Sequence, residues 1–406
     1  MNVPSMRKGS PLWIGVVFFF VGFSPGMWIP GLPSVLRAAG HEAWIPWIYM
    51  GIPIGSIVSP LLLGALSDGR FAAQKLCGYV MLLGGCSMSL AFGALYLGVR
   101  VEVFVALMII NALLSAPLWA LVTQCALSYL HGQEDRFPYY RVYGTVGWMV
   151  AGLVGGFLLS ADSSPVSGLV GGLLRFPVAF FCFLMPHCEP KDQRAKGKQF
   201  SLWQMLGGGS KALWQDRNTR VLLLSAGVIA IPVTSFFMYL PLQITEHGVS
   251  KPTVWLSLGQ WCEIPAMLTL AWACRKYRIK WLILFGLVVT VIRQGIFAVS
   301  AETGLFWIIV PGVLTHGITY SYFLTVAQVY MEKRVAPELR GRAQGMLSLM
   351  FGGFGSLIGV FLVSTIFRNQ VDIEVGSGWS GYWWIMCAIG VLPCIYFAFR
   401  YQKMES

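Results

Sequence analysis

Charged side chains are scarce in this chain. Only 11% of its 406 residues are Asp, Glu, Lys or Arg, whereas 56% are hydrophobic and the mean hydropathy is +0.67. Soluble domains carry about 25% charged residues, so water alone could not solvate a protein of this composition. The chain is therefore predicted to lie in a lipid bilayer, although its length alone would indicate two or three soluble domains.

The sequence patterns of common enzymes and metal sites are also missing. The chain contains no HExxH, Walker or GxSxG motif, and no loop is long enough for a nucleotide-binding domain. None of its nine cysteines forms a CxxC pair or a Cys/His ligand pattern, so we expect no disulfide, no metal and no cofactor. The protein is predicted not to be an enzyme and not to be driven by ATP.

Long apolar runs dominate the chain instead. A spanning helix needs about 20 mainly apolar residues, and such runs are too long and too uniform for barrel strands. The first run exceeds the length of a signal-peptide core and is expected to be retained. The fold class predicted is an all-α membrane protein with twelve transmembrane helices in two six-helix halves. The helices are expected at 12–36, 44–66, 73–98, 102–130, 139–160, 166–186, 219–244, 252–274, 280–299, 304–331, 342–367 and 380–400.

A polar segment separates the sixth predicted helix from the seventh. Between His187 and Arg220 the chain holds seven basic residues and three acids. We expect an N-terminal half over 1–187, a cytoplasmic linker over 188–218 and a C-terminal half over 219–406. A short interfacial helix between Phe200 and Trp214 and a disordered linker fit the pattern equally well.

The basic residues predict the orientation of the chain. With the N-terminus in the cytoplasm, 23 Lys and Arg lie on the cytoplasmic side and four on the other, while Arg175 and Arg293 lie within helices. Cytoplasmic loops of membrane proteins carry such an excess. We therefore expect a multi-pass protein of the cell inner membrane with both termini cytoplasmic. The net charge of +12 is then explained by topology, and no nucleic-acid partner is expected.

The loop after the second predicted helix contains Gly64-Ala65-Leu66-Ser67-Asp68-Gly69-Arg70. With two six-helix halves around a basic central loop, this segment resembles the loop signature of the major facilitator superfamily. The resemblance implies a transporter with its substrate site near mid-membrane, between the halves. Asp68 can cap a helix end and pair with a basic residue, so Asp68 and Arg70 are expected to act as a conformational latch. An ordinary charged turn is the alternative.

Four stretches carry a narrower resemblance. They are Phe137 to Trp148, Gln260 to Glu263, Arg275 to Lys280 with Arg293, and Met331 to Met346. Together they resemble the nucleoside:proton symporter family of that superfamily. This resemblance implies proton-coupled nucleoside uptake by alternating access, and we expect a monomer whose partners are a nucleoside, protons and the bilayer. Two alternatives stay open: a carrier for a sugar or another polar metabolite, and a non-transporting membrane sensor.

Glu263 is a lone carboxylate within an apolar helix. A charge there is costly to bury, so such residues usually face a cavity and are functional. Gln260 lies three residues earlier, on the same helix face, and an amide beside a carboxylate can hold the vicinal hydroxyls of a ribose. The resemblance implies substrate contacts at both positions, and Glu263 is expected to carry the proton. A silent pairing of Glu263 with an arginine and simple packing of Gln260 are the alternatives.

Three further candidates lie at helical spacing at the start of the fifth predicted helix. Arg141, Thr145 and Trp148 share one stripe. The planar fork of Arg141 can donate to base carbonyls, and Trp148 could stack on a base. The resemblance implies substrate contacts at an Arg, a Thr and an aromatic residue here, and Tyr320 in the tenth helix is expected to stack on the ligand. A topogenic charge for Arg141 and helix packing for both aromatic residues are the alternatives.

The chain departs from the family at two places. Ser321 stands where characterised relatives carry an acid in the tenth helix, and Pro232 and Ser235 stand where they carry amides in the seventh. These departures bear on proton coupling and on base selectivity. Of the two arginines within helices, Arg293 is expected to pair with Glu263 or with the region of helices 10 and 11. Arg175 is expected to snorkel or to face the central cavity.

Overall fold

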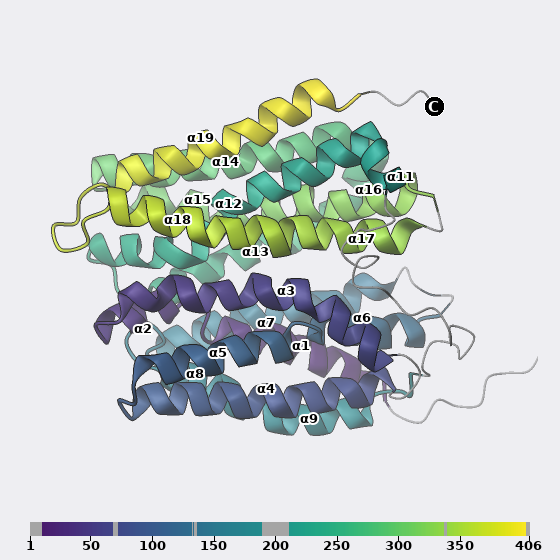
Figure 1. Cartoon of the computed structure of the whole chain (residues 1–406), viewed down its shortest axis with the longest axis horizontal. Helices are drawn as coiled ribbons and strands as arrows, with labels where there is room; N and C mark the ends of the chain where they lie inside the picture. The colour runs from purple at the N-terminus through teal and green to yellow at the C-terminus, as the bar shows by residue number, and fades with distance from the viewer. Residues whose placement is uncertain are drawn as a thin grey trace, which may run out of the picture. The chain divides into compact units, whose positions relative to one another are not determined.

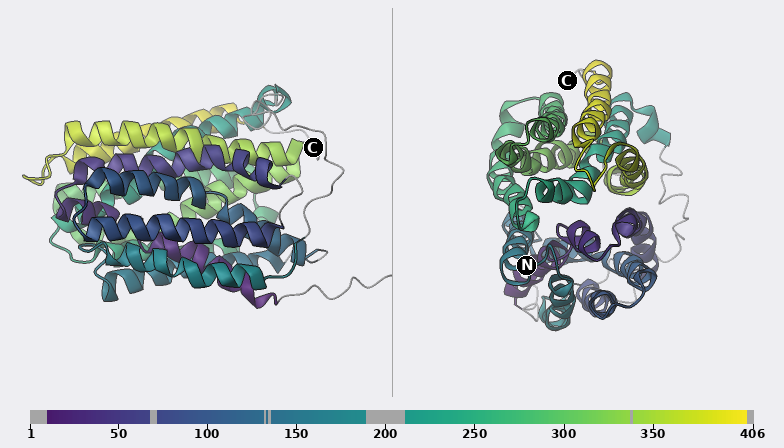
Figure 2. Two further views of the ribbon diagram at one scale, coloured as in Figure 1. Left: turned by 60° about the horizontal axis from the view of Figure 1, so that its bottom comes forward. Right: turned by 90° about the vertical axis from the view of Figure 1, so that its left-hand side faces the viewer.

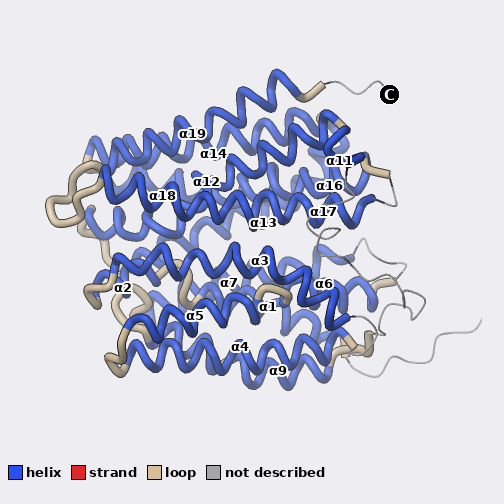
Figure 3. Tube along the Cα trace, in the orientation of Figure 1, coloured by secondary structure: helices blue, strands red, loops and turns tan. Residues whose placement is uncertain are grey.

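The structure is a computed structural model that describes residues 10–67, 72–131, 133, 136–188, 211–336 and 339–402. It divides the chain into two compact units, Met1–Phe200 and Ser201–Ser406. The described residues are helical apart from turns, loops and an isolated bridge between Asp372 and Ser377 (Figure 3). The predicted all-helical fold is confirmed. The predicted latch residues Asp68 and Arg70, and most of the predicted linker, lie outside the described residues.

The helices of the first unit run roughly along one another (Figure 1). They are α1 (Leu12–Gly26), α2 (Leu32–Ala38), the 3-10 turn η1 (Glu42–Trp44), α3 (Ile45–Ser67), α4 (Ala73–Tyr96), α5 (Val101–Ser115), α6 (Leu118–Tyr129), α7 (Phe137–Leu158), α8 (Val166–Leu173) and α9 (Arg175–Leu184). The predicted helix 12–36 is therefore broken after Gly26, in a proline-rich stretch. Proline cannot donate its backbone nitrogen to a helical hydrogen bond, which explains the break.

The second unit is also built of helices. They are α11 (Lys211–Gln215), α12 (Arg217–Glu246), α13 (Pro252–Lys276), α14 (Ile279–Thr303), η4 (Phe306–Ile308), α15 (Ile309–Thr319), η5 (Tyr320–Thr325), α16 (Val326–Arg334), α17 (Arg340–Ser348), η7 (Leu349–Gly355), α18 (Ser356–Gln370) and α19 (Trp379–Arg400). Of the predicted interfacial helix over 200–214, only the part in α11 falls among the described residues. Seen end-on, each unit is a bundle of helices (Figure 2), and each has its own apolar core.

Seven helical stretches of the described residues are long and apolar enough to cross a membrane, and α1 is a shorter apolar helix. All twelve predicted spans coincide with a helix or with a run of consecutive helices. The seven stretches are Ala73–Tyr96, Val101–Tyr129, Val166–Leu184, Arg217–Glu246, Ile279–Thr303, Arg342–Gln370 and Trp379–Arg400. In lipid a chain must satisfy its backbone hydrogen bonds internally, which is why apolar runs of this length fold as helices.

Helices α1 and α7 of the first unit pack with their backbones almost touching. A Cβ atom at Gly22 would overlap the backbone of Gly144, and a Cβ atom at Gly147 would overlap the backbone of Phe19. Small residues permit such close approach between membrane helices. The contact fixes the rotation of α7 about its axis, and with it the direction of the α7 face that carries the predicted substrate contacts.

Candidate functional site

The three candidates of the first unit lie on consecutive turns of α7. Thr145 is 4% exposed, and Arg141 and Trp148 are half-buried. The guanidinium carbon of Arg141 lies 4.4 Å from the ring centre of Trp119 in α6. A cation over an aromatic face is attracted by the ring quadrupole, so Trp119 holds the guanidinium in place. Trp119 has no distinguishing local pattern in the sequence, and only the packing of α6 beside α7 identifies it.

Arg175 at the start of α9 has a structural role. Its side chain is 4% exposed. Its Nε donates to the hydroxyl of Ser24 at 2.7 Å, and its Nη1 donates to the hydroxyl of Ser115 at 2.7 Å. These bonds tie α9 to α1 and α5. Arg175 therefore extends into the core of its unit and does not snorkel outward.

The structure brings the three candidates of the second unit together on neighbouring elements. Gln260 on α13 is 4% exposed, and its Oε1 has no hydrogen-bond partner among the described residues. Glu263, one turn further along α13, is half-buried. Tyr320 is half-buried on η5, which packs against α13. A buried acceptor without a partner is costly, so Gln260 is well suited to accept a hydrogen bond from a ligand.

Close backbone packing of α13 against α15 sets this geometry. A Cβ atom at Gly317 would lie 2.7 Å from Cβ of Glu263 and closer still to its backbone. A Cβ atom at Gly259 would lie 3.1 Å from Cβ of His316. Tyr320 follows in η5, a π-helical segment, and such wide turns are frequent at functional sites. Close contact between the helix backbones, in addition to side-chain packing, therefore fixes the positions of Glu263 and Tyr320.

Arg293 contacts residues of two neighbouring helices. Its Nη1 lies 3.2 Å from Nδ1 of His316 on α15, and its guanidinium carbon lies 5.0 Å from the ring centre of Phe236. The partner is therefore in the tenth predicted helix, the second of the two alternatives that the sequence left open. The sequence contained His316 but gave no signal for this pairing.

The positions expected to depart from the family, Pro232, Ser235 and Ser321, are all buried. Ser235 is fully buried and donates to the carbonyl of Pro232 at 2.7 Å. Gln294 on α14 donates to the same carbonyl at 2.8 Å. Ser321 is 1% exposed, and its hydroxyl has no partner among the described residues. Neither serine presents a carboxylate or an amide, so Glu263 is the acid that this part of the second unit offers.

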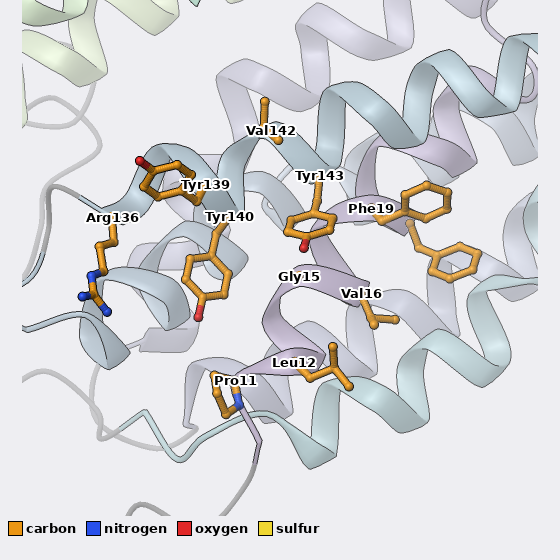
Figure 4. A pocket seen from close by; sticks show the side chains of 11 residues that line it. Pro11, Leu12, Gly15, Val16, Phe19, Arg136, Tyr139, Tyr140, Val142 and Tyr143 are labelled. Carbon is orange, nitrogen blue, oxygen red and sulfur yellow. The ribbon is translucent and has the colours of Figure 1, made fainter. Parts of the chain in front are cut away.

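A groove of about 720 Å³ lies between α1 and α7 (Figure 4). Apolar and aromatic side chains form most of its surface, and Arg136 supplies its charge at one end. None of the six predicted substrate contacts lines it, and its Leu12 and Tyr139 are strongly exposed. A surface of this kind suits lipid chains better than a polar solute. The lining residues are Pro11, Leu12, Gly15, Val16, Phe19, Phe20, Arg136, Tyr139, Tyr140, Val142 and Tyr143.

Comparison with solved structures shows the fold. The crystal structure of the nucleoside transporter NupG matches with a TM-score of 0.80 at 20% identity, over 97% of this chain and 99% of that one. The xylose transporter XylE from E. coli, in an inward open conformation, matches with a TM-score of 0.71 at 13% identity, over 97% and 96% of the two chains. These likenesses identify the major facilitator fold that the sequence predicted.

Comparison of sequences gives the family. The family model described as nucleoside H+ symporter matches residues 12–405. The putative nucleoside transporter YegT of Escherichia coli is 31% identical over 97% of this chain and 94% of its own length. The nucleoside permease NupG of the same organism is 23% identical over 94% and 93% of the two chains, and its xanthosine permease is 23% identical over 95% and 94%. The chain therefore belongs to the nucleoside H+ symporter family, and it is a multi-pass membrane transporter and not an enzyme.

Proposed function

We propose that this protein takes up nucleosides together with protons, by alternating access. The observation that carries the proposal is the grouping of Gln260, Glu263 and Tyr320 on α13 and η5, two elements that pack together. Among the described residues, Glu263 is the only acid that lies in the middle of a helical span. Family membership and relatives named as nucleoside and xanthosine permeases support the choice of substrate.

The chemistry of these side chains matches the parts of a nucleoside. The carboxylate of Glu263 accepts hydrogen bonds from ribose hydroxyls, and the amide of Gln260 both donates and accepts. The ring of Tyr320 supplies an apolar face for stacking. In the first unit the guanidinium of Arg141 donates to base carbonyls, with Thr145 and Trp148 on the same α7 face. Glu263 also carries the coupled proton in this proposal, because it is the one carboxylic acid among the six proposed contacts.

The remaining features of the proposal follow from the sequence. The protein works as a monomer in the cell inner membrane, with both termini and the linker over 188–218 in the cytoplasm. The halves extend over 1–187 and 219–406. Asp68 and Arg70 form the conformational latch. The excess of basic residues on one side of the membrane supports this orientation.

Uptake by the purified protein in proteoliposomes tests the proposal. Labelled uridine is offered with an acidic exterior, and a panel of nucleosides and sugars competes with it. We expect accumulation that a protonophore abolishes and that nucleosides inhibit while sugars do not. Competition by sugars alone would show a sugar carrier. Absence of both uptake and counterflow for every solute would favour a membrane sensor.

Truncation of the proposed ligand contacts should weaken substrate binding. A hydrogen bond to a charged group contributes roughly 1.5–3 kcal/mol, and one between neutral groups roughly 1 kcal/mol. Arg141→Ala should therefore raise the Kd for uridine about ten- to a hundredfold, and Gln260→Ala about fivefold. Calorimetric titration measures both. Arg136→Ala is the control, because this exposed arginine stands at the N-terminal end of the same helix, outside the proposed site. An unchanged Kd in both site variants would place the substrate elsewhere.

A further inference from the structure

Arg293 is a fully buried cation in the core of the second unit. Its side chain is 0% exposed, and the face of the Phe236 ring covers its guanidinium. Its Nη1 lies 3.2 Å from Nδ1 of His316. Its Nε and Nη2 atoms have no hydrogen-bond partner among the described residues. An intramembrane charge is costly and usually functional, so we expect the contact between Arg293 and His316 to have a function.

The direction of this hydrogen bond determines the protonation of His316. A guanidinium has only donor groups and stays protonated in proteins. Nδ1 of His316 must therefore be the acceptor, and a neutral imidazole then carries its proton on Nε2. A second proton, on Nδ1, would remove the acceptor and place two cations in contact in a buried site. Like charges at such short range strongly oppose ionisation.

The other groups that face His316 do not reverse this effect. From α12 it meets the rings of Phe236, stacked at 4.5 Å, and Phe237, edge-on at 5.3 Å. From α13 it meets the helix at Gly259, where an added Cβ atom would lie 3.1 Å from Cβ of His316. In η5, which continues directly from its own helix α15, the centre of the Tyr320 ring lies 4.8 Å from the centre of the imidazole. Among these groups, Arg293 of α14 is the one that hydrogen-bonds the imidazole in the described structure.

We propose that Arg293 is a positioning residue that locks His316 as the neutral tautomer with its proton on Nε2. Histidine is the side chain whose charge ordinarily changes near neutral pH, and His316 lies beside the proposed site. His316 then takes no part in the proton step. The hydrogen-bonding groups of its imidazole, on α15 beside α13, therefore stay the same at every working pH. Glu263 is then left as the group that carries the proton, a consequence that rests on the proposed function.

Nitrogen NMR of the histidines in the full-length protein, in lipid nanodiscs, tests the lock directly. The chain has five histidines, and loss of one signal in His316→Gln assigns that residue. We expect the wild-type protein to show an unprotonated Nδ1 and a protonated Nε2 from about pH 5 to about pH 8. A proton on Nδ1, or a titration of His316 within that range, would overturn the proposal before any substitution of Arg293 is made.

Two substitutions of Arg293 separate the effect of charge from that of packing. Arg293→Met removes the donor, and we expect a mixture of the two tautomers or a titrating imidazole. Arg293→Lys keeps a donating cation and should keep the wild-type tautomer. An unchanged single tautomer in Arg293→Met would show that another group sets it. Equal loss of the tautomer in both variants would show that shape, and not charge, is responsible. Thermal melting of each variant confirms that it is folded.

The NMR measurement is independent of the transported solute. A failure to accumulate uridine in proteoliposomes would overturn the proposed function and leave the tautomer result intact. A wrong tautomer in a protein that accumulates uridine would overturn the lock alone. The two proposals therefore fail in distinguishable ways.

Discussion

Glu263→Gln is expected to abolish accumulation of uridine against its gradient while leaving a weaker exchange of uridine across the membrane. Glutamine keeps the size of the side chain and much of its hydrogen bonding, but it cannot bind or release a proton. Proton-driven net uptake needs the release of a proton in every cycle. In exchange the carrier returns across the membrane with substrate bound, so no proton has to be released. Glu263→Ala should lose both activities, because it also removes the hydrogen bonds to the substrate.

Both activities are measured in proteoliposomes at equal protein incorporation. Glu332→Gln is the matched control, since this acid lies at the end of α16 in an exposed ion pair with Arg340 at 3.4 Å. Exposed pairs contribute only about 0–1 kcal/mol, so the control should accumulate uridine normally. Full proton-driven accumulation by Glu263→Gln would show that the proton travels by another route.

Gly317→Ala should damage the second unit more than any substitution of an exposed residue. The added Cβ would overlap the backbone N and Cα of Glu263, and backbone cannot rotate away as the end of a side chain can. The helices α13 and α15 must therefore separate. Overpacking of this kind costs roughly 1–3 kcal/mol and occasionally more. Because the overlap is with Glu263 itself, we also expect loss of most uridine uptake in the protein that remains folded.

Thermal melting and initial rates of uptake measure these two effects. Gly345→Ala is the control, because a Cβ at this helical position in the same unit meets nothing within 4 Å. Alanine favours a helix over glycine by about 1 kcal/mol, so the control should be as stable as the wild type or slightly more so. A Gly317→Ala protein with wild-type melting and uptake would contradict the close packing of α13 on α15.

The sequence by itself determined the helices, because their formation depends on local composition. The expected span 219–244 is found as Arg217–Glu246, and the expected 380–400 as Trp379–Arg400. In lipid the hydrogen bonds of a helix stay within each segment, so no distant residue is needed to predict it. The close-packed glycines of α1 and α7 could not be predicted in this way, since glycine is frequent along the chain and only the partner helix distinguishes them.

The tertiary structure decided which polar side chains meet. Arg293 appeared in the sequence with two possible partners, and the structure pairs it with His316, 23 residues away. Trp119 gave no signal in the sequence, yet it lies under the guanidinium of Arg141. Both contacts join different helices, so they depend on how each helix is rotated against its neighbour. That rotation is set by close packing of side chains and glycines from distant parts of the chain, which no local pattern records.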